Sequence, residues 1–410
     1  MRVPVWIVPL LGVVLLAAYP SFAQVDSAVV SSLRSFDLPY FTYGSGLGIT
    51  SPDSLFRLTI RFRIQSRVGM ELENGEVGAV QARVRRLRLR LDGFVYTPKL
   101  RYSVQLGFAT EDIETPLLDY TPNILQDAMM YYSPDEHWTL GFGQTKLPGN
   151  RERVTSSGDL QLADRSAVNS IFNLDRDFGL QALYVNALSG EALYRLKGAI
   201  SSGEGRNWIS SPGMHLCYTV RGEVLPFGPF ADRGDYYQGD LAREQSPKLS
   251  IGLVYSYNNK ALRSAGQRGA LLHEPRDITT YMADALVKYN GWAFFAEWLR
   301  RTAPDPVTRE PASPDDIVLV FKGHGLTLQG SYLFPGDYEL VARYASVKAD
   351  PEIQDYVNRS QHYTTIGVTK YLRGHRLKLQ LDATYLDELR IGQLSATGVW
   401  NFRGQIELGI

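Results

Sequence analysis

The chain has few of the residues on which common enzymes and stapled secreted domains depend. Its single cysteine, Cys217, cannot form an internal disulfide. Its histidines are few and scattered, and His324, His362 and His375 have no metal-ligand spacing. The G-x-S-x-G, P-loop and H-E-x-x-H patterns are absent from the sequence. We therefore expect no enzyme, no catalytic residue, no metal and no cofactor.

Long apolar runs are also scarce, and the one present lies at the N-terminus. Residues 3–19 are mostly apolar, follow Arg2 and precede a small-x-small pattern at residues 21–23. This order is typical of a secretory signal peptide, so we expect residues 1–23 to be cleaved. An uncleaved anchor helix is the alternative, which the two prolines of the run disfavour. No later segment approaches the ~20 apolar residues of a transmembrane helix.

The chain has no net charge, since 43 Lys and Arg residues balance 43 Asp and Glu residues. We accordingly expect no nucleic-acid partner. The mean hydropathy of −0.18 would suit a soluble protein. It also suits a barrel in a membrane, because polar residues that face inward cancel the apolar residues that face outward.

Two alternating segments between residues 56 and 95 organise the rest of the chain. Apolar residues share one parity and polar residues the other, which gives each strand an apolar face and a charged face. The apolar set is Phe56, Leu58, Ile60, Phe62, Ile64, Leu87, Leu89, Leu91 and Val95, and the basic set is Arg57, Arg61, Arg63, Arg67, Arg86, Arg88 and Arg90. A strand with one face toward lipid and one toward water is what a transmembrane β-barrel needs.

The same alternation recurs along the chain and predicts sixteen strands. They cover residues 55–70, 80–96, 100–109, 125–133, 137–146, 176–186, 191–201, 213–226, 247–258, 278–289, 292–301, 318–334, 337–347, 361–372, 375–386 and 398–410. We expect an all-β protein, a sixteen-stranded antiparallel transmembrane barrel over residues 54–410. Residues 24–53 show no clean period and are expected to form a periplasmic N-terminal segment.

The connectors between these strands alternate in length. Short turns such as Asn290-Gly291 alternate with long polar loops such as 147–175, which is the pattern of short periplasmic turns and long external loops in outer-membrane barrels. The connector 226–247 breaks the pattern, and we interpret it as an extended turn over the lower mouth. Twenty-four tyrosines and six tryptophans fit aromatic girdles at two membrane interfaces. A secreted β-sandwich or propeller is the alternative for the strand array.

Three groups of residues resemble the phosphate-selective porins of the O and P type. The first group is Gly46-Leu47-Gly48-Ile49 with Ser51-Pro52-Asp53-Ser54 and Arg63-Ile64-Gln65. The second is Arg85-Arg86-Leu87-Arg88-Leu89-Arg90 with Gly93 and Pro98. The third is Gly143-Gln144-Thr145-Lys146 with Pro148, Ser156-Ser157, Arg165-Ser166 and Arg176-Asp177-Phe178-Gly179. The resemblance covers the mature chain. It implies a homotrimer of sixteen-stranded barrels in the bacterial outer membrane, with loops folded into the lumen and an arginine ladder that draws anions to a basic constriction.

The inward arginines are the candidate site. Residues two apart on a strand are about 6.6–6.8 Å apart, so Arg57, Arg61, Arg63, Arg67, Arg86, Arg88 and Arg90 could pass a phosphate-like anion from site to site. The alternative is that they only keep a pore wall hydrated. We expect loop 147–175, with Arg151, Arg153 and Arg165, to fold inward and Lys146 to lie at the constriction. A solvated external loop is the alternative. Arg83 and Arg85 have the opposite parity from Arg86, Arg88 and Arg90. Either a β-bulge lies near Arg85, or both side chains lie above the lipid at the external rim, and we favour the second interpretation.

Other functions remain open from the sequence. Asp284, Glu297, Glu339 and Asp382 are expected on the inner face of later strands. Opposite the basic strands they would create a transverse field, which suits a general diffusion porin with little anion preference. A barrel that conducts nothing and acts as an adhesin or scaffold is a further alternative. The expected partners are outer-membrane lipid and small anions.

Overall fold

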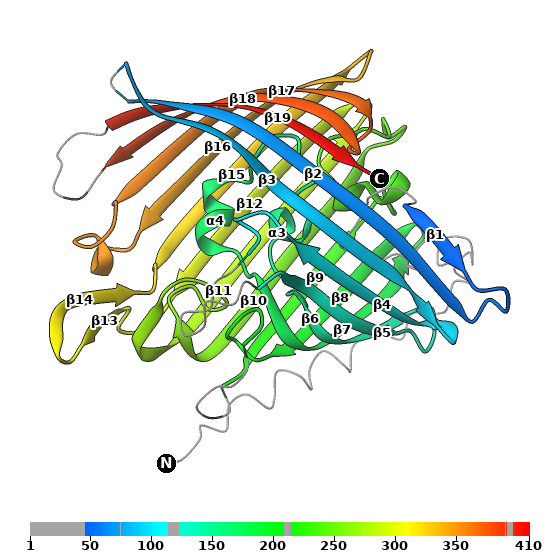
Figure 1. Cartoon of the computed structure of the whole chain (residues 1–410), viewed down its shortest axis with the longest axis horizontal. Helices are drawn as coiled ribbons and strands as arrows, with labels where there is room; N and C mark the ends of the chain where they lie inside the picture. Colours follow the sequence, from blue (N-terminus) through cyan, green and yellow to red (C-terminus); the bar gives the residue numbers. More distant parts are fainter. Residues whose placement is uncertain are drawn as a thin grey trace.

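The computed structural model describes residues 46–410 except 74, 114–122, 209–212, 214, 390 and 392–396. The predicted signal peptide and residues 24–45 of segment 24–53 lie outside the described residues. Strands dominate the described chain, and they wrap around the segment that carries α3 (Arg151–Val154) and α4 (Ala167–Phe172) (Figure 1).

Sixteen antiparallel strands form a closed barrel, which confirms the predicted fold. They are β2 (Phe56–Glu73), β3 (Glu76–Val95), β4 (Thr97–Gly107), β5 (Leu125–Tyr132), β6 (Trp138–Lys146), β7 (Arg176–Ser189), β8 (Ala192–Ser201), β9 (Cys217–Leu225), β10 (Lys248–Arg263), β11 (Leu271–Tyr289), β12 (Trp292–Thr302), β15 (Gly323–Phe334), β16 (Tyr338–Ala349), β17 (Ser360–Arg373), β18 (Leu377–Leu389) and β19 (Thr397–Gly409). Each pairs with the next along the barrel. β19 closes the ring on β2, from Val399 opposite Glu73 to Gly409 opposite Arg63. Closure gives every strand of the ring a partner on both sides.

Three further strands lie outside this ring. β1 (Leu47–Thr50) pairs with β2 from Leu47 opposite Ile60, just beyond the point where β19 ends, so it extends the edge that β19 occupies. The sequence showed no period there, and this strand was not predicted. β13 (Val307–Glu310) and β14 (Ser313–Leu319) form a hairpin in the loop between β12 and β15.

The two ends of the barrel differ. At one end, here named the turn end, the connectors are mostly short. Asn290 and Gly291 have φ of 49° and 85°, the positive values that a two-residue type I′ turn requires. The opposite end, here named the loop end, carries the longer loops. In outer-membrane barrels the short turns face the periplasm.

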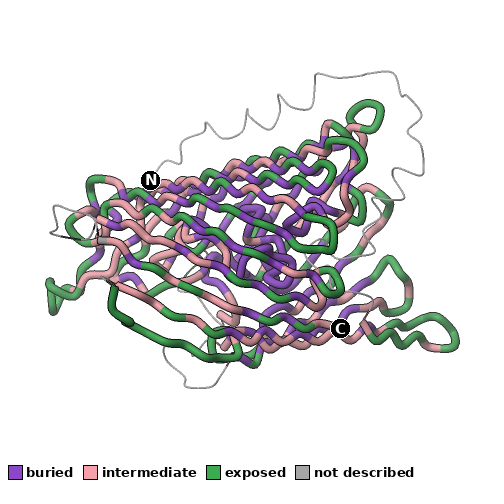
Figure 2. Tube along the Cα trace, turned by 90° about the horizontal axis from the view of Figure 1, so that it is seen from above, coloured by how far each residue is buried: buried purple, intermediate pink, exposed green. Residues whose placement is uncertain are grey.

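Burial alternates along the strands, as the sequence pattern predicts. On β8, Arg195 and Lys197 are buried while Leu196 and Ile200 are about half exposed on the outer surface. Figure 2 shows this alternation along the wall and buried chain inside it. Aromatic residues gather on the outer face at the turn end, where the rings of Trp292 and Tyr332 are 4.6 Å apart. Among the described residues, no helix is long and apolar enough to cross a membrane.

The interior is occupied by loop 147–175. This loop contains α3 (Arg151–Val154) and α4 (Ala167–Phe172). Its apolar side chains pack on the inner wall and form one buried cluster with it. The cluster comprises Leu147, Val168, Phe172 and Leu174 of the loop with Ala199, Cys217, Val254, Met282, Leu299, Ala345 and Val347 of the strands.

The connector 226–247 also enters the barrel, from the turn end. It contains the 3₁₀ segment η1 (Ala231–Tyr236). The Gln238 N–H donates to the Asp159 carbonyl at 2.9 Å, and Lys288 of β11 donates to the carbonyls of Gly234 and Tyr237 at 2.6 and 2.9 Å. The interpretation as an extended turn over the lower mouth did not include this inward reach. The connector meets a turn of this end, where the Gly291 N–H donates to Asp240 at 2.7 Å, and it is also a second inserted segment that contacts the first.

Candidate functional site

The register of β2 and β3 places arginines side by side. Arg61 lies opposite Arg90, and Arg63 lies opposite Arg88. Like charges that face each other across strands are destabilising unless other groups compensate them. The sequence predicted the two columns but not their compensation.

Carboxylates accompany most members of the ladder. Arg61 lies 3.7 Å from Asp92 and Arg63 lies 3.4 Å from Glu407. The other pairs are Arg67 with Asp164, Arg88 with Asp112, and Arg90 with Asp92. Five of the seven ladder residues are therefore paired with acids, and three of these five, Arg63, Arg67 and Arg90, are also buried.

The two remaining ladder residues differ from the rest. Arg57 is exposed at the turn end, and the Nη1 of Arg86 donates to Oε1 of Gln65 at 2.7 Å. Of the seven predicted ladder residues, only Arg86 lines the cavity described below.

A β-bulge changes the direction of Arg85. Gln65 pairs with Arg86 and Ser66 with Val84, so Arg85 is the extra residue on β3. Beyond the bulge the inward parity switches, and Arg83 lies opposite Arg67. The favoured interpretation, in which Arg83 and Arg85 sit at the external rim above the lipid, is wrong. Both side chains reach Glu111, and Arg85 also lies 3.5 Å from Asp164.

The acidic residues of the later strands hold the inserted loop. Arg151 donates from Nε to Asp284 at 2.7 Å, and Asn150 donates to Glu297 at 2.9 Å. Farther along the loop, Gln161 donates to Glu339 at 2.6 Å and the Ala163 N–H donates to Asp382 at 3.0 Å. All four carboxylates predicted from the sequence as an acidic wall thus bind loop 147–175.

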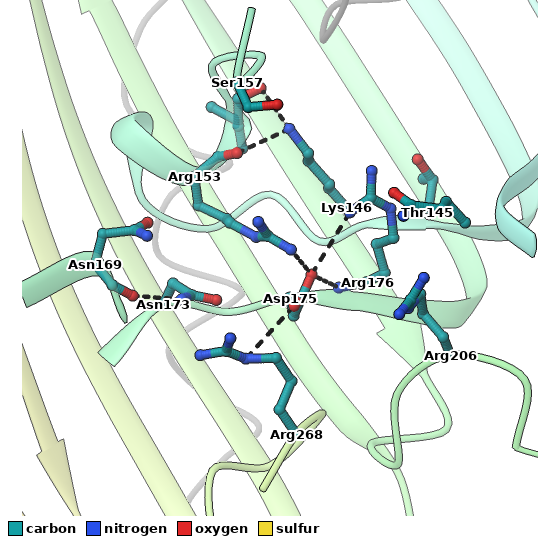
Figure 3. Close-up of polar contacts among 12 residues, drawn as sticks. Thr145, Lys146, Arg153, Ser157, Asn169, Asn173, Asp175, Arg176, Arg206 and Arg268 are labelled. Atoms are coloured by element: carbon teal, nitrogen blue, oxygen red, sulfur yellow. Dashed lines mark hydrogen bonds and ion pairs between the residues drawn. The ribbon is translucent and has the colours of Figure 1, made fainter. Parts of the chain in front are cut away.

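Basic residues of the wall hold the same loop through its carbonyl groups. Lys146, the predicted constriction residue, donates from Nζ to the carbonyls of Arg153 and Val154 at 2.9 and 3.2 Å (Figure 3). Lys378 of β18 donates to the carbonyls of Gly158 and Leu160, both at 2.6 Å. Lys146 is 3% exposed, so its ammonium group is engaged by the loop.

A cavity of about 400 Å³ lies between the inserted loop and the strands, and we name it the arginine cavity. Among the described residues, seven arginines and a single carboxylate, that of Asp164, line it. The lining residues are Arg85, Arg86, Arg153, Asp164, Arg165, Ala167, Asn169, Ser170, Asn173, Arg268, Arg343, Ala345, Tyr363, Thr365, Thr384, Asn401 and Arg403. Guanidinium groups donate in a fork that matches oxyanions, and they stay charged at any physiological pH.

The cavity arginines come from distant parts of the chain. Arg153 and Arg165, predicted for the constriction loop, do line the cavity, whereas Arg151 is buried against β11. Arg85, Arg268, Arg343 and Arg403 were not among the predicted site residues. The inward parity of Arg343 and Arg403 on their strands was a usable signal in the sequence. For Arg268, in the loop between β10 and β11, the sequence offers none.

Asp175 organises one side of this region. Arg153, Arg176 and Arg268 converge on its carboxylate, the last two at 3.9 and 3.4 Å (Figure 3). Burial alone would raise the pKa of Asp175, but the charges of Arg153, Arg268 and Arg176 outweigh it and hold the pKa well below its ordinary value. Burial lowers the pKa of Arg153 to about 10, so this side chain stays protonated at neutral pH.

Nothing in the described part of the chain gathers three or more His, Cys, Asp or Glu side chains that could hold a metal ion. The lining of the arginine cavity is basic and polar.

Comparison with known proteins gives the same architecture. The profile of the family described as phosphate-selective porin O and P matches residues 58–400. No curated protein sequence matches the chain.

Solved structures with the same fold are outer-membrane channels. The anion-selective porin from Comamonas acidovorans has 12% identity and a TM-score of 0.52, over 87% of this chain and 100% of that one. OprB of Pseudomonas putida has 10% identity and a TM-score of 0.54, over 86% of this chain and 94% of that one. The channel DcaP of Acinetobacter baumannii has 11% identity and a TM-score of 0.51, over 88% and 99%. At these identities the likeness shows the fold alone.

Proposed function

This chain belongs to the phosphate-selective porin O and P family, and from that premise we propose that it conducts small oxyanions, phosphate or a related anion, across the outer membrane. The family and the barrel are those of an outer-membrane channel rather than an enzyme. The preference for anions is the part that we propose, and the arginine cavity supports it.

The composition of that cavity is the observation that favours an oxyanion. Seven arginines face one carboxylate in a space of about 400 Å³, although the chain as a whole is neutral. Hydrogen bonds from guanidinium to an anionic oxygen are charge-assisted and often bidentate. Asn169, Ser170 and Asn173 on and beside α4 add neutral polar groups to the same lining. A chloride ion, a phosphate and a small organic acid would all be attracted, and the forked donors favour the oxygen acids.

The ladder is the second part of the proposal. Arg57, Arg61, Arg63, Arg67, Arg86, Arg88 and Arg90 would guide the anion along the β2–β3 wall. Their carboxylate partners would keep each contact weak enough for release, as conduction requires. Lys146 would act through the loop that it holds, and not by direct contact.

A general diffusion channel with a transverse field is the rival function. Its basis is the row of acids at Asp284, Glu297, Glu339 and Asp382 opposite the basic strands. These carboxylates are engaged by the inserted loop, so less of their field remains for a passing solute. A homotrimer and contact with outer-membrane lipid remain predictions that the family resemblance supports.

Single-channel recording in a planar bilayer tests the anion preference. The reversal potential is measured under a potassium chloride gradient, and phosphate is then titrated in. We expect anion selectivity and a block of the chloride current by low phosphate. A reversal potential near zero or of cation sign, without phosphate block, would support the diffusion channel, and absence of current would support a scaffold.

A matched pair of variants assigns the preference to the cavity. Arg268 is about one-third exposed and lines the cavity, so Arg268→Gln should fold normally and weaken both the selectivity and the phosphate block. Arg276→Gln removes the same charge from β11 outside the cavity lining, where Arg276 pairs with Glu274. Equal effects of the two substitutions would argue against the cavity as the selective site.

A further inference from the structure

The single carboxylate of the arginine cavity is surrounded by guanidinium groups. Asp164 Oδ2 accepts from Arg67 Nη1 at 2.5 Å, and Oδ1 accepts from Arg67 Nη2 at 3.1 Å. Arg85 lies 3.5 Å and Arg403 3.6 Å from the same carboxylate. These three arginines come from β2, β3 and β19, so the carboxylate occupies a point where three strands present positive charge.

Asp164 is ionised in this setting and remains within reach of the cavity. Burial would raise the pKa of Asp164, but the charge and hydrogen bonds of Arg67 and the charges of Arg85 and Arg86 lower it below its ordinary value. Its side chain is 26% exposed, whereas that of Arg67 is 2% exposed. A dissolved oxyanion could therefore approach the place that Asp164 fills.

The backbone around Asp164 is held without help from its charge. The Ala163 N–H donates to Asp382 at 3.0 Å, and Arg67 donates to the Ala163 carbonyl at 2.7 Å. Arg343 donates to the carbonyl of Asp164 itself at 2.9 Å. The loop thus presents the carboxylate from a fixed position, and a neutral side chain of the same shape would leave these anchors in place.

We propose that Asp164 is a tethered counter-ion, which competes with the conducted oxyanion for Arg85 and Arg403, the two of these arginines that line the cavity. This inference rests on the proposed function. Without the competitor, the guanidinium groups would hold an oxyanion strongly, and a channel needs binding weak enough for the anion to leave. Asp164 lowers the affinity of the cavity for the oxyanion, and the anion can then leave the cavity and be conducted.

The substitution Asp164→Asn tests this role. Removal of one negative charge beside three guanidinium groups should lower the phosphate concentration that half-blocks the chloride current by about tenfold. The anion selectivity in potassium chloride alone should also rise. Asp164→Glu keeps the charge and should retain wild-type block. Asp350→Asn removes the same charge from the Arg300–Asp350 pair, away from the cavity lining, and should change neither quantity.

The outcomes separate this inference from the proposed function. If phosphate blocks the wild-type channel but Asp164→Asn leaves the block unchanged or weakens it, the counter-ion role is overturned while the oxyanion channel stands. If phosphate does not block the wild-type channel, both fail together. Recovery of the variant as a folded barrel is checked by its heat-modifiable gel mobility, and the potassium chloride selectivity provides a second readout on the same channels.

Discussion

Arg151 in the inserted loop donates from Nε to Oδ1 of Asp284 on β11 at 2.7 Å, across 133 residues of sequence. The same guanidinium donates to Oγ of Ser250 at 2.7 Å and to the Asp235 carbonyl at 2.9 Å. One side chain therefore joins the loop, the strand wall and the connector 226–247. The acids of the later strands serve as anchors for a loop that lies inside the barrel.

Loss of this anchor should loosen the loop. We expect Arg151→Gln to give a larger and noisier single-channel conductance, because removal of one partner of a buried ion pair typically costs ~3–5 kcal/mol. Asp284 keeps Arg221 at 2.6 Å, so the wall itself should remain folded. Arg300→Gln, which breaks the pair with Asp350 at the loop end, is the control, since the Arg300 side chain is 32% exposed. Conductance traces equal to wild type for Arg151→Gln would contradict the anchoring role.

The connector 226–247 depends on Lys288 in a similar way. Lys288 is 1% exposed, donates to two connector carbonyls and lies 4.0 Å from the ring centre of Tyr237. We expect Lys288→Met to free the connector and make it several-fold more susceptible to protease in detergent-solubilised protein, with the strands intact. Lys370→Met is matched, because Lys370 contacts the Gly336 carbonyl and the Tyr338 ring at another turn. Equal cleavage of the connector in both variants would show that Lys288 does not secure it.

Gly93 marks a close approach between β2 and β3. A Cβ atom there would lie 1.8 Å from the Arg57 carbonyl oxygen and 2.9 Å from Oη of Tyr102, so the two strands would have to separate. We expect Gly93→Ala to reduce the yield of heat-modifiable folded barrel by more than half. Gly198→Ala on β8, where a Cβ would meet nothing within 4 Å, should fold like wild type. Similar yields for the two variants would contradict the close approach.

The strand array was predictable because each strand separates an apolar face from a polar one, and alternation reports that separation directly. Each of the sixteen barrel strands overlaps a strand that the alternation predicted. The bounds differ at several strand ends: β11 begins seven residues before the predicted 278, and residues 318–322 of the predicted strand 318–334 lie outside β15. The bulge at Arg85 was not predictable in the same way, since one extra residue reverses the parity of Arg83 without any signal in composition. The paired ladder shows the same limit. Arg63 and Glu407 meet only when β19 closes on β2, a contact that alternation within either strand does not encode.

The interior was harder to predict than the wall. Loop 147–175 was expected to fold inward, and it does, but the contacts that hold it were not predicted. Arg151, Asn150 and Gln161 bind acids on strands far along the chain. Arg343 and Arg403 have inward parity, but only the folded loop makes them neighbours of Arg153 and Arg165. Which charges meet across the barrel is a property of closure, and a one-dimensional pattern cannot supply it.

Glu204 at the loop end provides a pH-dependent test of the structure. Its side chain is 1% exposed, and Oε1 accepts from the Leu262 N–H at 3.4 Å. Among the described residues, Oε2 has no hydrogen-bond partner. Burial raises the pKa of Glu204 to about 7, and the negative charge of Asp177 adds to the rise, while the Leu262 N–H and Arg263 oppose it.

The sign of the effect follows from the raised pKa. The ordinary pKa of a glutamate is 4.5, and that of folded Glu204 is about 7. At pH values between these two, Glu204 keeps its proton in the folded protein but has released it in the unfolded chain. The stabilisation is therefore complete below about pH 4.5 and is lost as the pH rises through about 7. We expect the unfolding midpoint of the wild type to fall by roughly 2–4 °C from pH 5 to pH 8 through this group.

Glu204→Gln mimics the protonated carboxyl group and should remove the pH dependence of the unfolding midpoint that Glu204 causes. The midpoint of the variant should therefore exceed that of the wild type at pH 8. Glu274→Gln alters an exposed carboxylate and should leave the dependence as in wild type. The midpoints are measured by gel mobility after heating at each pH. A Glu204→Gln barrel that loses stability on going from pH 5 to pH 8 as steeply as wild type would show that Glu204 ionises in the folded state as freely as it does in water.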